Sequence, residues 1–487
     1  MLFNSYPFIL LFLPTILVVY HGLRHLERRR AAIGALVVAS LFFYGWWNPI
    51  YLLLLVVLIL VNYAAVQWLL RLPLTSPGMR KLALVVGVAG NLMVLGYFKY
   101  ANFFVDNVNA LGLAVNLAPI VLPLGISFFT FQKIALLVDT YQGKVKTLDF
   151  LDFALFVCFF PQLIAGPIVH HAEVMPQFRR AGSMDIETFA QGCAIFAIGL
   201  FKKVMLADSL AGYVKLTFDA AGAGTALSGA AAWSGVLAYT LQLYFDFSGY
   251  SDMAVGAALL FGIQLPLNFA SPYQADSIID FWRRWHMTLS RFLRDYLYIP
   301  LGGNRHGKTR RYINLFITML LGGLWHGAGW TFVIWGGLHG CYLVVNHTWY
   351  ALRIRLGING EPSVFGRAAA RSLTFLAVTV GWVFFRSDDM VSAIRMLKAM
   401  TGSDGFGFSM QPASPWLLIA PALALVWLAP NMQEMTGYGP RSGSDRRSIR
   451  LPLGWSWSVG SAVYYGCLFA VSVLSMSRVS EFIYFQF

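Results

Sequence analysis

Long apolar runs separated by short polar turns make up most of this chain. A membrane-spanning helix needs about 20 mainly apolar residues. Segments that meet this requirement or come close to it cover residues 5–22, 31–47, 50–70, 82–99, 187–206, 227–247, 313–326, 328–350, 368–385, 414–431 and 456–476. Two further apolar runs, 118–139 and 150–169, contain proline and glycine, which favours kinked or re-entrant segments buried in protein. The pattern predicts an all-α polytopic membrane protein with about 11–13 membrane segments.

Composition agrees with this interpretation and excludes a soluble enzyme that is merely anchored. Hydrophobic residues make up 58% of the chain and charged residues 12%, whereas soluble domains carry about 25% charged residues. There is no internal repeat and no polar stretch long enough to fold alone. We therefore expect one integral membrane domain over residues 1–487, with any soluble partner supplied by another chain. We expect contact with membrane lipid and no nucleic-acid partner.

Basic residues between the spans predict the orientation of the chain. Arginines gather in the loops at residues 24–30 and 441–450, and Arg71, Arg80 and Lys81 lie between the third and fourth spans. Cytoplasmic loops carry an excess of lysine and arginine. Placing these loops in the cytoplasm puts both the N-terminus and the C-terminus on the outer side of the membrane.

The most informative part of the chain is a basic stretch followed by a long uncharged one. Residues 281–311 hold eight basic residues and one acid, and this net +7 is half of the chain's +14. Helical spacing of the apolar positions predicts an amphipathic helix that ends at Pro300. It is either an interface helix on anionic lipid or a basic vestibule for a phosphorylated donor such as coenzyme A. In the second interpretation the phosphates meet Arg283, Arg284 and Arg291.

Residues 312–352 contain no Asp, Glu, Lys or Arg, and His326 lies within this run among four glycines at residues 322–329. An ionisable residue at membrane depth is a functional-site hypothesis. A neutral imidazole can take the proton of a hydroxyl that attacks a thioester. The alternative is a buried histidine that bridges closely packed helices. His286, in the basic stretch, is likewise either a packed imidazole or a second functional residue.

The remaining polar positions favour structural roles. Asp246 lies in a polar island between apolar runs and is interpreted as a helix cap, a hydrogen-bond node or a residue that orients an imidazole. The four cysteines lie in apolar segments without CxxC spacing, which indicates buried free thiols. His170 and His171 are adjacent and His339 and His347 are eight apart, so neither pair has the i,i+4 spacing of a helical metal site. No metal and no permanently bound cofactor are expected.

These motifs resemble those of the membrane-bound O-acyltransferases, in particular the branch that acetylates bacterial exopolysaccharides such as alginate. The matching stretches are PQLIAGP at 161–167, YFDFSGYSD at 244–252, DFWRRWHMTLS at 280–290, RDY at 294–296, IPLGGNR at 299–305 and LWHG at 324–327. The resemblance covers essentially the whole chain, with residues 280–350 as the catalytic motif region. Related teichoic acid D-alanyltransferases share the Trp-His-Met core but usually lack the LGGNR stretch.

The resemblance implies membrane helices around a catalytic funnel that crosses the bacterial inner membrane. The outer side, on which the loop charges place both termini, is then the periplasm. Acetyl-CoA is the implied donor on the cytoplasmic side. A periplasmic acetyl-carrier protein and the polysaccharide synthase complex are the implied partners. His326 is implied as the essential residue and His286 as the second. Trp325, Asp246 and Asn304 are expected to support them.

Two alternatives remain open at this point. One is acyl transfer to a different envelope polymer, such as peptidoglycan or teichoic acid, or to cellulose instead of alginate. The other is a protein without chemistry of its own, either a transporter or flippase of polysaccharide export or a scaffold of a synthase complex. Broken helices also occur in transporters, but we find no inverted repeat.

Overall fold

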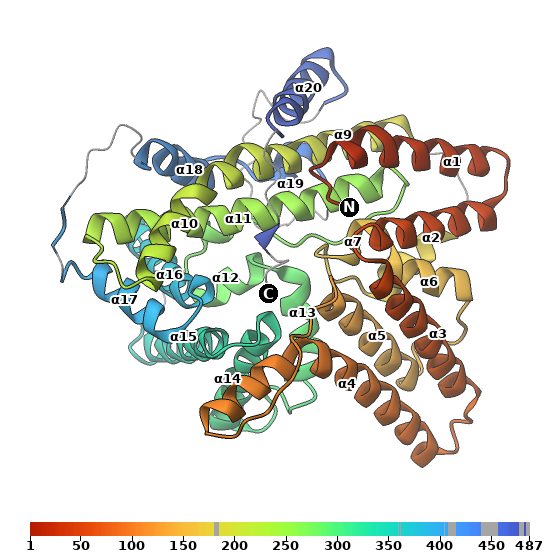
Figure 1. Cartoon of the computed structure of the whole chain (residues 1–487), viewed down its shortest axis with the longest axis horizontal. Coiled ribbons are helices and arrows are strands. Elements are labelled where there is room, and N and C mark those ends of the chain that lie inside the picture. Colours follow the sequence, from red (N-terminus) through yellow and green to blue (C-terminus); the bar gives the residue numbers. More distant parts are fainter. Residues whose placement is uncertain are drawn as a thin grey trace. The chain divides into compact units, whose positions relative to one another are not determined.

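The computed structural model describes residues 1–179, 185–358, 360, 362–403, 405–407, 415–439, 456–476 and 482–483. Helices connected by turns and extended segments make up these residues, and no strand occurs among them (Figure 1). The chain divides into two compact units. Unit 1 contains Met1–Leu200, Tyr250–Pro266 and the described part of Trp455–Val479. Unit 2 contains Phe201–Gly249 and the described parts of Leu267–Gly454 and Ser480–Phe487. The expectation of one functional domain over residues 1–487 stays a prediction.

Unit 1 is built mainly from the first part of the chain. Its elements are the π-helix η1 (Pro7–Phe12), α1 (Leu13–His25), α2 (Arg29–Gly45), α3 (Pro49–Arg71), α4 (Pro77–Ala110), α5 (Ile126–Tyr141), α6 (Phe150–Cys158), α7 (Phe160–Leu163), α8 (His171–Phe178), most of α9 (Ile186–Phe201) and α20 (Val459–Leu474). Helices α3, α4 and α5 pack against one another (Figure 1). Helix α11 (Gly229–Leu259) crosses the boundary between the units in sequence.

Local sequence explains where several of these helices begin. Asn48 caps α3 by accepting a hydrogen bond from the amide of Ile50 at 2.9 Å. Pro49 follows as the first helical residue, where its missing N–H removes no helical hydrogen bond. Before α5 the backbone is irregular up to Gly125, which has a φ of 71° in the left-handed region. A side chain at Gly125 would meet the carbonyl oxygen of Leu163 at 2.7 Å, so glycine is required at this kink.

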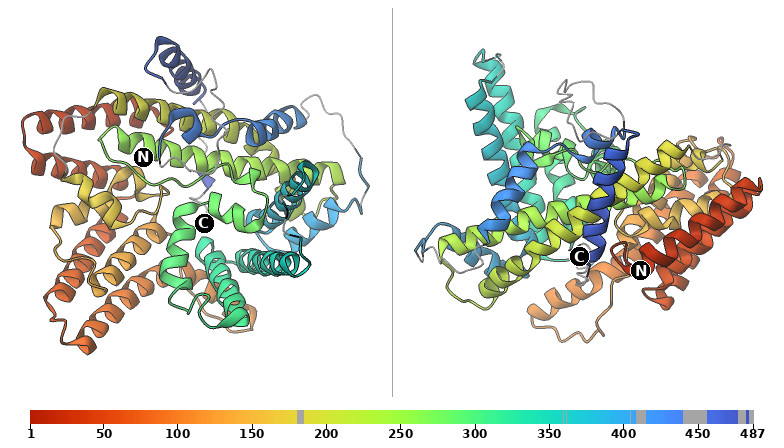
Figure 2. Two further views of the ribbon diagram at one scale, coloured as in Figure 1. Left: turned by 180° about the vertical axis from the view of Figure 1, so that it is seen from behind. Right: turned by 90° about the horizontal axis from the view of Figure 1, so that it is seen from above.

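Unit 2 carries the basic and uncharged stretches identified above. Its remaining elements are the π-helix η2 (Lys202–Ala207), α10 (Asp208–Gly222), the 3₁₀ turn η3 (Pro272–Gln274), α12 (Ile278–Arg284), α13 (Met287–Leu293), the π-helix η4 (Arg294–Tyr298), α14 (Gly307–His326), α15 (Trp330–Arg355), α16 (Val364–Arg386), α17 (Met390–Met400), α18 (Trp416–Leu428) and α19 (Met432–Thr436). Figure 2 shows α14 and α15 as two long helices side by side.

The all-α, multi-pass fold class is confirmed. Among the described residues, four helical stretches are long and apolar enough to cross a membrane, namely Pro7–His25, Pro49–Arg71, Pro77–Ala110 and Val364–Arg386. Helices α18 and α20 are shorter but also apolar. The runs at 118–139 and 150–169 are interrupted, as expected. Irregular backbone precedes α5, and helical structure is interrupted between α6 and α7. The total of about 11–13 segments and the funnel stay predictions.

The cysteine expectation was only partly right. The four thiols are free, but Cys193, Cys341 and Cys467 are exposed at the protein surface and only Cys158 is buried. An apolar helix in a membrane protein turns some apolar positions outward, so apolar sequence context does not establish burial within the protein. The arginine-rich loop at 441–450, used above for orientation, lies outside the described residues.

Candidate active site

The amphipathic helix expected up to Pro300 is broken at His286. Helix α12 ends at Arg284, and His286 has φ 43° and ψ 53°, in the left-handed region. Backbone bonds to another segment replace the helical ones there: the amide of Met287 donates to the Asn268 carbonyl at 2.9 Å, and Ala270 donates to the Arg284 carbonyl at 3.0 Å. The expectation of one continuous helix was wrong because apolar spacing does not register these long-range bonds. A non-glycine residue in this conformation costs roughly 1–3 kcal/mol and is typical of functional sites.

The side chain of Asn268 fixes the His286 ring. Asn268 Oδ1 lies 3.2 Å from His286 Nδ1, and it accepts hydrogen bonds from the Thr288 hydroxyl at 2.7 Å and the Thr288 amide at 3.4 Å. A backbone amide can only donate, so the oxygen of Asn268 faces these groups, and a neutral His286 carries its proton on Nδ1. Its Nε2 then presents a lone pair. The ring is fully buried and lies edge-on to Phe247, with centroids 4.8 Å apart.

His326 is the last residue of α14. The chain then turns extended through Gly327, where an added side chain would collide with the Phe332 ring at 2.2 Å. The His326 ring is buried, and its centroid lies 5.1 Å from that of Trp335 and 5.3 Å from that of Phe385. Its centroid is 6.3 Å from that of His286. The fold therefore brings the two predicted histidines together from separate motifs.

Glycines allow α14 and α15 to approach closely beside His326. A Cβ added to Gly323 would lie 2.3 Å from the Phe332 carbonyl oxygen, and one added to Gly336 would lie 2.5 Å from that of Met319. Only a residue without a side chain fits either position. Gly323 belongs to the glycine-rich run at residues 322–329.

The other predicted site residues fall into two groups. Trp325 is buried, with its ring centroid 4.9 Å from that of His326 and 6.2 Å from that of His286. The remaining residues lie nearer the protein surface: Arg283 and Asn304 are exposed, and Arg284 and Arg291 are half-buried. Arg284 is paired with Asp280 at 2.9 Å. Their role toward a donor stays a prediction.

Asp246 lies inside α11 and is not a helix cap. Its carboxylate binds Lys203 Nζ at 2.6 Å and accepts the amide of Ile483 at 3.0 Å. Lys203 also binds Asp208 at 2.8 Å. Asp246 and Lys203 are almost completely buried, which makes the pair a structural node, one of the roles expected for Asp246. The partner found for this carboxylate is an ammonium group and not an imidazole.

Three residues in this region were not identified from the sequence as site residues. Asn268 holds His286 but lies 18 positions away in an irregular segment. Trp335 contacts His326, as described above, and also lies against His339, with centroids 4.9 Å apart. His339 is fully buried, and neither ring nitrogen has a hydrogen-bond partner among the described residues. The signal for His339 was the one used for His326, an ionisable residue in a run without Asp, Glu, Lys or Arg.

Comparisons with known proteins identify the family to which the chain is related. The sequence model of MBOAT, the membrane-bound O-acyltransferase family, matches residues 41–357. A peptidoglycan O-acetyltransferase of Helicobacter pylori is 46% identical over 83% of this chain and 80% of its own. A probable alginate O-acetylase (AlgI) of Pseudomonas aeruginosa is 39% identical over the full length of both chains. A teichoic acid D-alanyltransferase of Streptococcus thermophilus is 29% identical over 54% of this chain and 68% of its own.

The chain belongs to the membrane-bound O-acyltransferase family. It is a multi-pass membrane protein and an O-acyltransferase. The catalytic roles expected for His286 and His326 stay predictions.

Proposed function

We propose that this enzyme takes an acetyl group from cytoplasmic acetyl-CoA and passes it across the bacterial inner membrane for O-acetylation of a secreted exopolysaccharide of the alginate type. A periplasmic acetyl-carrier protein receives the group, and both termini of the enzyme face the periplasm. The observation that carries the proposal is the pair of buried rings of His286 and His326, 6.3 Å apart. The name of the full-length relative from Pseudomonas aeruginosa supports the polymer class.

The separation of the two rings suggests a different role for each histidine. A direct hydrogen bond needs nitrogens about 3 Å apart, and ring centroids 6.3 Å apart do not allow it. An acceptor hydroxyl between the rings is within reach of both. His326 removes the proton of the acceptor hydroxyl while the hydroxyl oxygen forms a bond to the thioester carbonyl carbon. The carbon–sulfur bond breaks, and the coenzyme A thiolate takes the proton from His326.

His286 positions the hydroxyl in this scheme. With its proton held on Nδ1 toward Asn268, the lone pair on Nε2 accepts a hydrogen bond and orients the attacking oxygen. The basic residues of the 281–311 stretch attract the coenzyme A phosphates. Arg305, Lys308 and Arg310 are exposed there, in addition to Arg283.

The proposal is tested in a deletion strain complemented with wild type, His326→Ala or His25→Ala. His25 is exposed at the end of α1 and serves as the matched control. Ester-linked acetyl on secreted polysaccharide should be restored by wild type and by His25→Ala, and should fall by about 100-fold or more with His326→Ala at equal membrane abundance. Equal restoration by all three would sink the catalytic assignment. Release of free thiol from acetyl-CoA by the purified enzyme tests the donor.

A second acceptor is favoured by one observation. The relative from Helicobacter pylori, at 46% identity, is named for peptidoglycan O-acetylation. The same strains therefore supply purified peptidoglycan for ester analysis. Acetyl that depends on His326 in peptidoglycan and not in secreted polysaccharide would replace the proposed acceptor while leaving the reaction type intact.

A further inference from the structure

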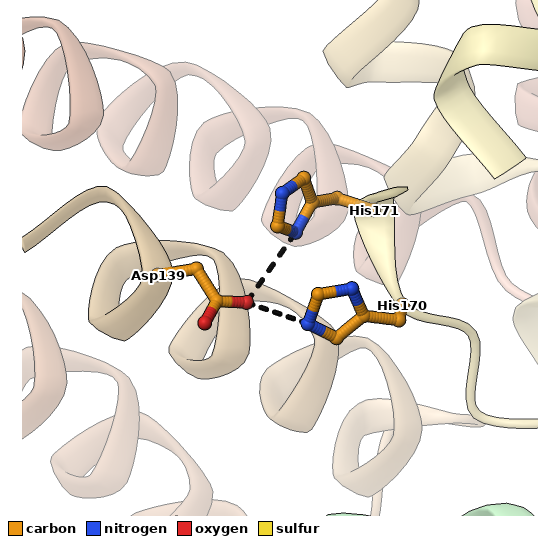
Figure 3. Close-up of side chains that lie close together, drawn as sticks. All are labelled: Asp139, His170 and His171. Carbon is orange, nitrogen blue, oxygen red and sulfur yellow. Dashed lines mark ion pairs between the residues drawn. The ribbon is translucent and has the colours of Figure 1, made fainter. Parts of the chain in front are cut away.

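Outside the candidate active site, one cluster of side chains in unit 1 has the composition of a metal site. Asp139 lies near the end of α5, and His170 and His171 lie at the start of α8. Each residue offers one ligand atom, and these atoms lie within 4.8 Å of one another. In Figure 3 both rings point at the same carboxylate. The adjacent positions of His170 and His171 in the sequence argued against a metal site. That argument applies only to sites whose ligands all come from one helix.

The two neighbouring rings reach one point because they use different nitrogens. His170 Nε2 lies 2.6 Å from Asp139 Oδ2, and His171 Nδ1 lies 3.4 Å from the same oxygen (Figure 3). The ring centroids are 4.5 Å apart. His170 has extended backbone before the helix begins, with φ −92° and ψ 138°, which lets its ring turn back beside that of His171.

One of the two distances to Asp139 Oδ2 agrees with a tetrahedral ion. Zinc bound at about 2.0–2.1 Å to nitrogen and oxygen ligands places the ligand atoms roughly 3.3–3.4 Å apart. The contact from His171 already has this length. The shorter contact from His170 is a hydrogen bond, which the ion replaces when the ring proton of His170 moves from Nε2 to Nδ1. His170 then carries its proton on Nδ1 and gives up the 3.4 Å hydrogen bond from the Ala172 amide.

The surroundings fit one-oxygen binding by Asp139. The carboxylate is fully buried, and its other oxygen is held by Lys144 Nζ at 2.9 Å, which turns Oδ2 toward the histidines. Lys144 is 56% exposed, so solvent screens its charge. His170 is 27% exposed, which gives an ion a route in and leaves room for a water as fourth ligand.

We infer that Asp139, His170 and His171 bind a divalent first-row transition metal of the zinc type, which ties the end of α5 to the start of α8. Two imidazoles and one carboxylate form a ligand set that zinc accepts, with one position left for water. None of the three ligand residues belongs to the proposed acyl-transfer site. The inference therefore does not depend on the proposed function.

The test uses full-length enzyme purified in detergent through a tag without histidine, stripped with a chelator and titrated with zinc chloride. Bound zinc is measured by mass spectrometry after removal of free ion. Wild type and the control His25→Ala should bind one zinc per chain. His171→Gln should bind it about 100-fold more weakly, a loss at least as large as those seen when groups that support metal ligands are removed. No stoichiometric zinc in wild type, or equal affinity in His171→Gln, would overturn the inference.

A second measurement does not rely on a variant that folds. X-ray absorption at the zinc edge of the wild-type protein should show two imidazole ligands together with oxygen. A first shell containing sulfur, or oxygen alone, would place the zinc elsewhere and overturn the assignment. Size-exclusion profiles of His171→Gln and wild type establish that any loss of zinc comes from the missing ligand.

Discussion

Asn268 accepts a hydrogen bond from Nδ1 of His286 at 3.2 Å and, through its backbone carbonyl, another from the amide of Met287 at 2.9 Å. One residue therefore holds both the imidazole of His286 and the break between α12 and α13 at which His286 lies. Without the backbone contact, His286 would be free to leave the left-handed conformation for an ordinary helical one. Without the side-chain contact the neutral ring would be free to exchange its two tautomers.

Replacing Asn268 with alanine should reduce acetyl transfer by about tenfold to 100-fold, which corresponds to about 1–3 kcal/mol for the lost buried hydrogen bonds. Asn268→Asp keeps an acceptor oxygen and should retain more activity than Asn268→Ala. Asn62→Ala is the matched control, because Asn62 is also buried and hydrogen-bonded, to Asn91 in unit 1. The measurement is ester-linked acetyl at equal membrane abundance. Similar losses in the Asn62 and Asn268 variants would indicate that Asn268 acts only on stability.

The conformation of His286 separates its role in folding from its role in chemistry. Asparagine tolerates the left-handed region, whereas a β-branched residue is a strong outlier there. His286→Asn should therefore fold and enter the membrane, while acetyl transfer falls by about 100-fold or more. His286→Val should also reduce the yield of folded protein. Near-normal acetylation by the asparagine variant would show that the imidazole is not needed.

Two glycines of α14 and α15 give a matched test of the close helix contact. In Gly323→Ala the new methyl would lie 2.3 Å from the Phe332 carbonyl oxygen, whereas in Gly337→Ala its closest neighbour is 3.7 Å away. Overpacking costs about 1–3 kcal/mol or more, so Gly323→Ala should lower the thermal unfolding midpoint in detergent and reduce acetyl transfer. Gly337→Ala should behave as wild type. Equal behaviour of the two variants would contradict the described packing.

The buried ion pair of Lys203 and Asp246 should behave as a structural unit. Removing the ammonium in Lys203→Met leaves a buried carboxylate without its partner, which costs about 3–5 kcal/mol. The double variant Lys203→Met with Asp246→Asn removes that charge and keeps an acceptor for the Ile483 amide. The double variant should be more stable than the single one, measured as monodisperse protein remaining after heating in detergent. A double variant less stable than Lys203→Met would argue against the pairing.

The class of fold and the motifs that carry the chemistry could be predicted from the amino-acid sequence alone. Runs of apolar residues long enough to cross a membrane predict helices there, because backbone groups in lipid must bond within their own segment. The expected span at residues 50–70 corresponds to α3 (Pro49–Arg71). His326 was identified because an ionisable side chain at membrane depth, here in a glycine-rich run without Asp, Glu, Lys or Arg, is a functional-site hypothesis.

How these motifs meet could not be predicted from the sequence, because it depends on the packing of the folded chain. The helix break at His286, its bond to Asn268 and the approach of Asp139 to His170 and His171 all join residues far apart in the chain. Such contacts depend on the packing of whole helices and leave no periodic trace in local sequence. Hydrophobic periodicity shows which face of a segment is apolar. It does not show which residue will be the partner in a buried hydrogen bond, because the fold sets that partner.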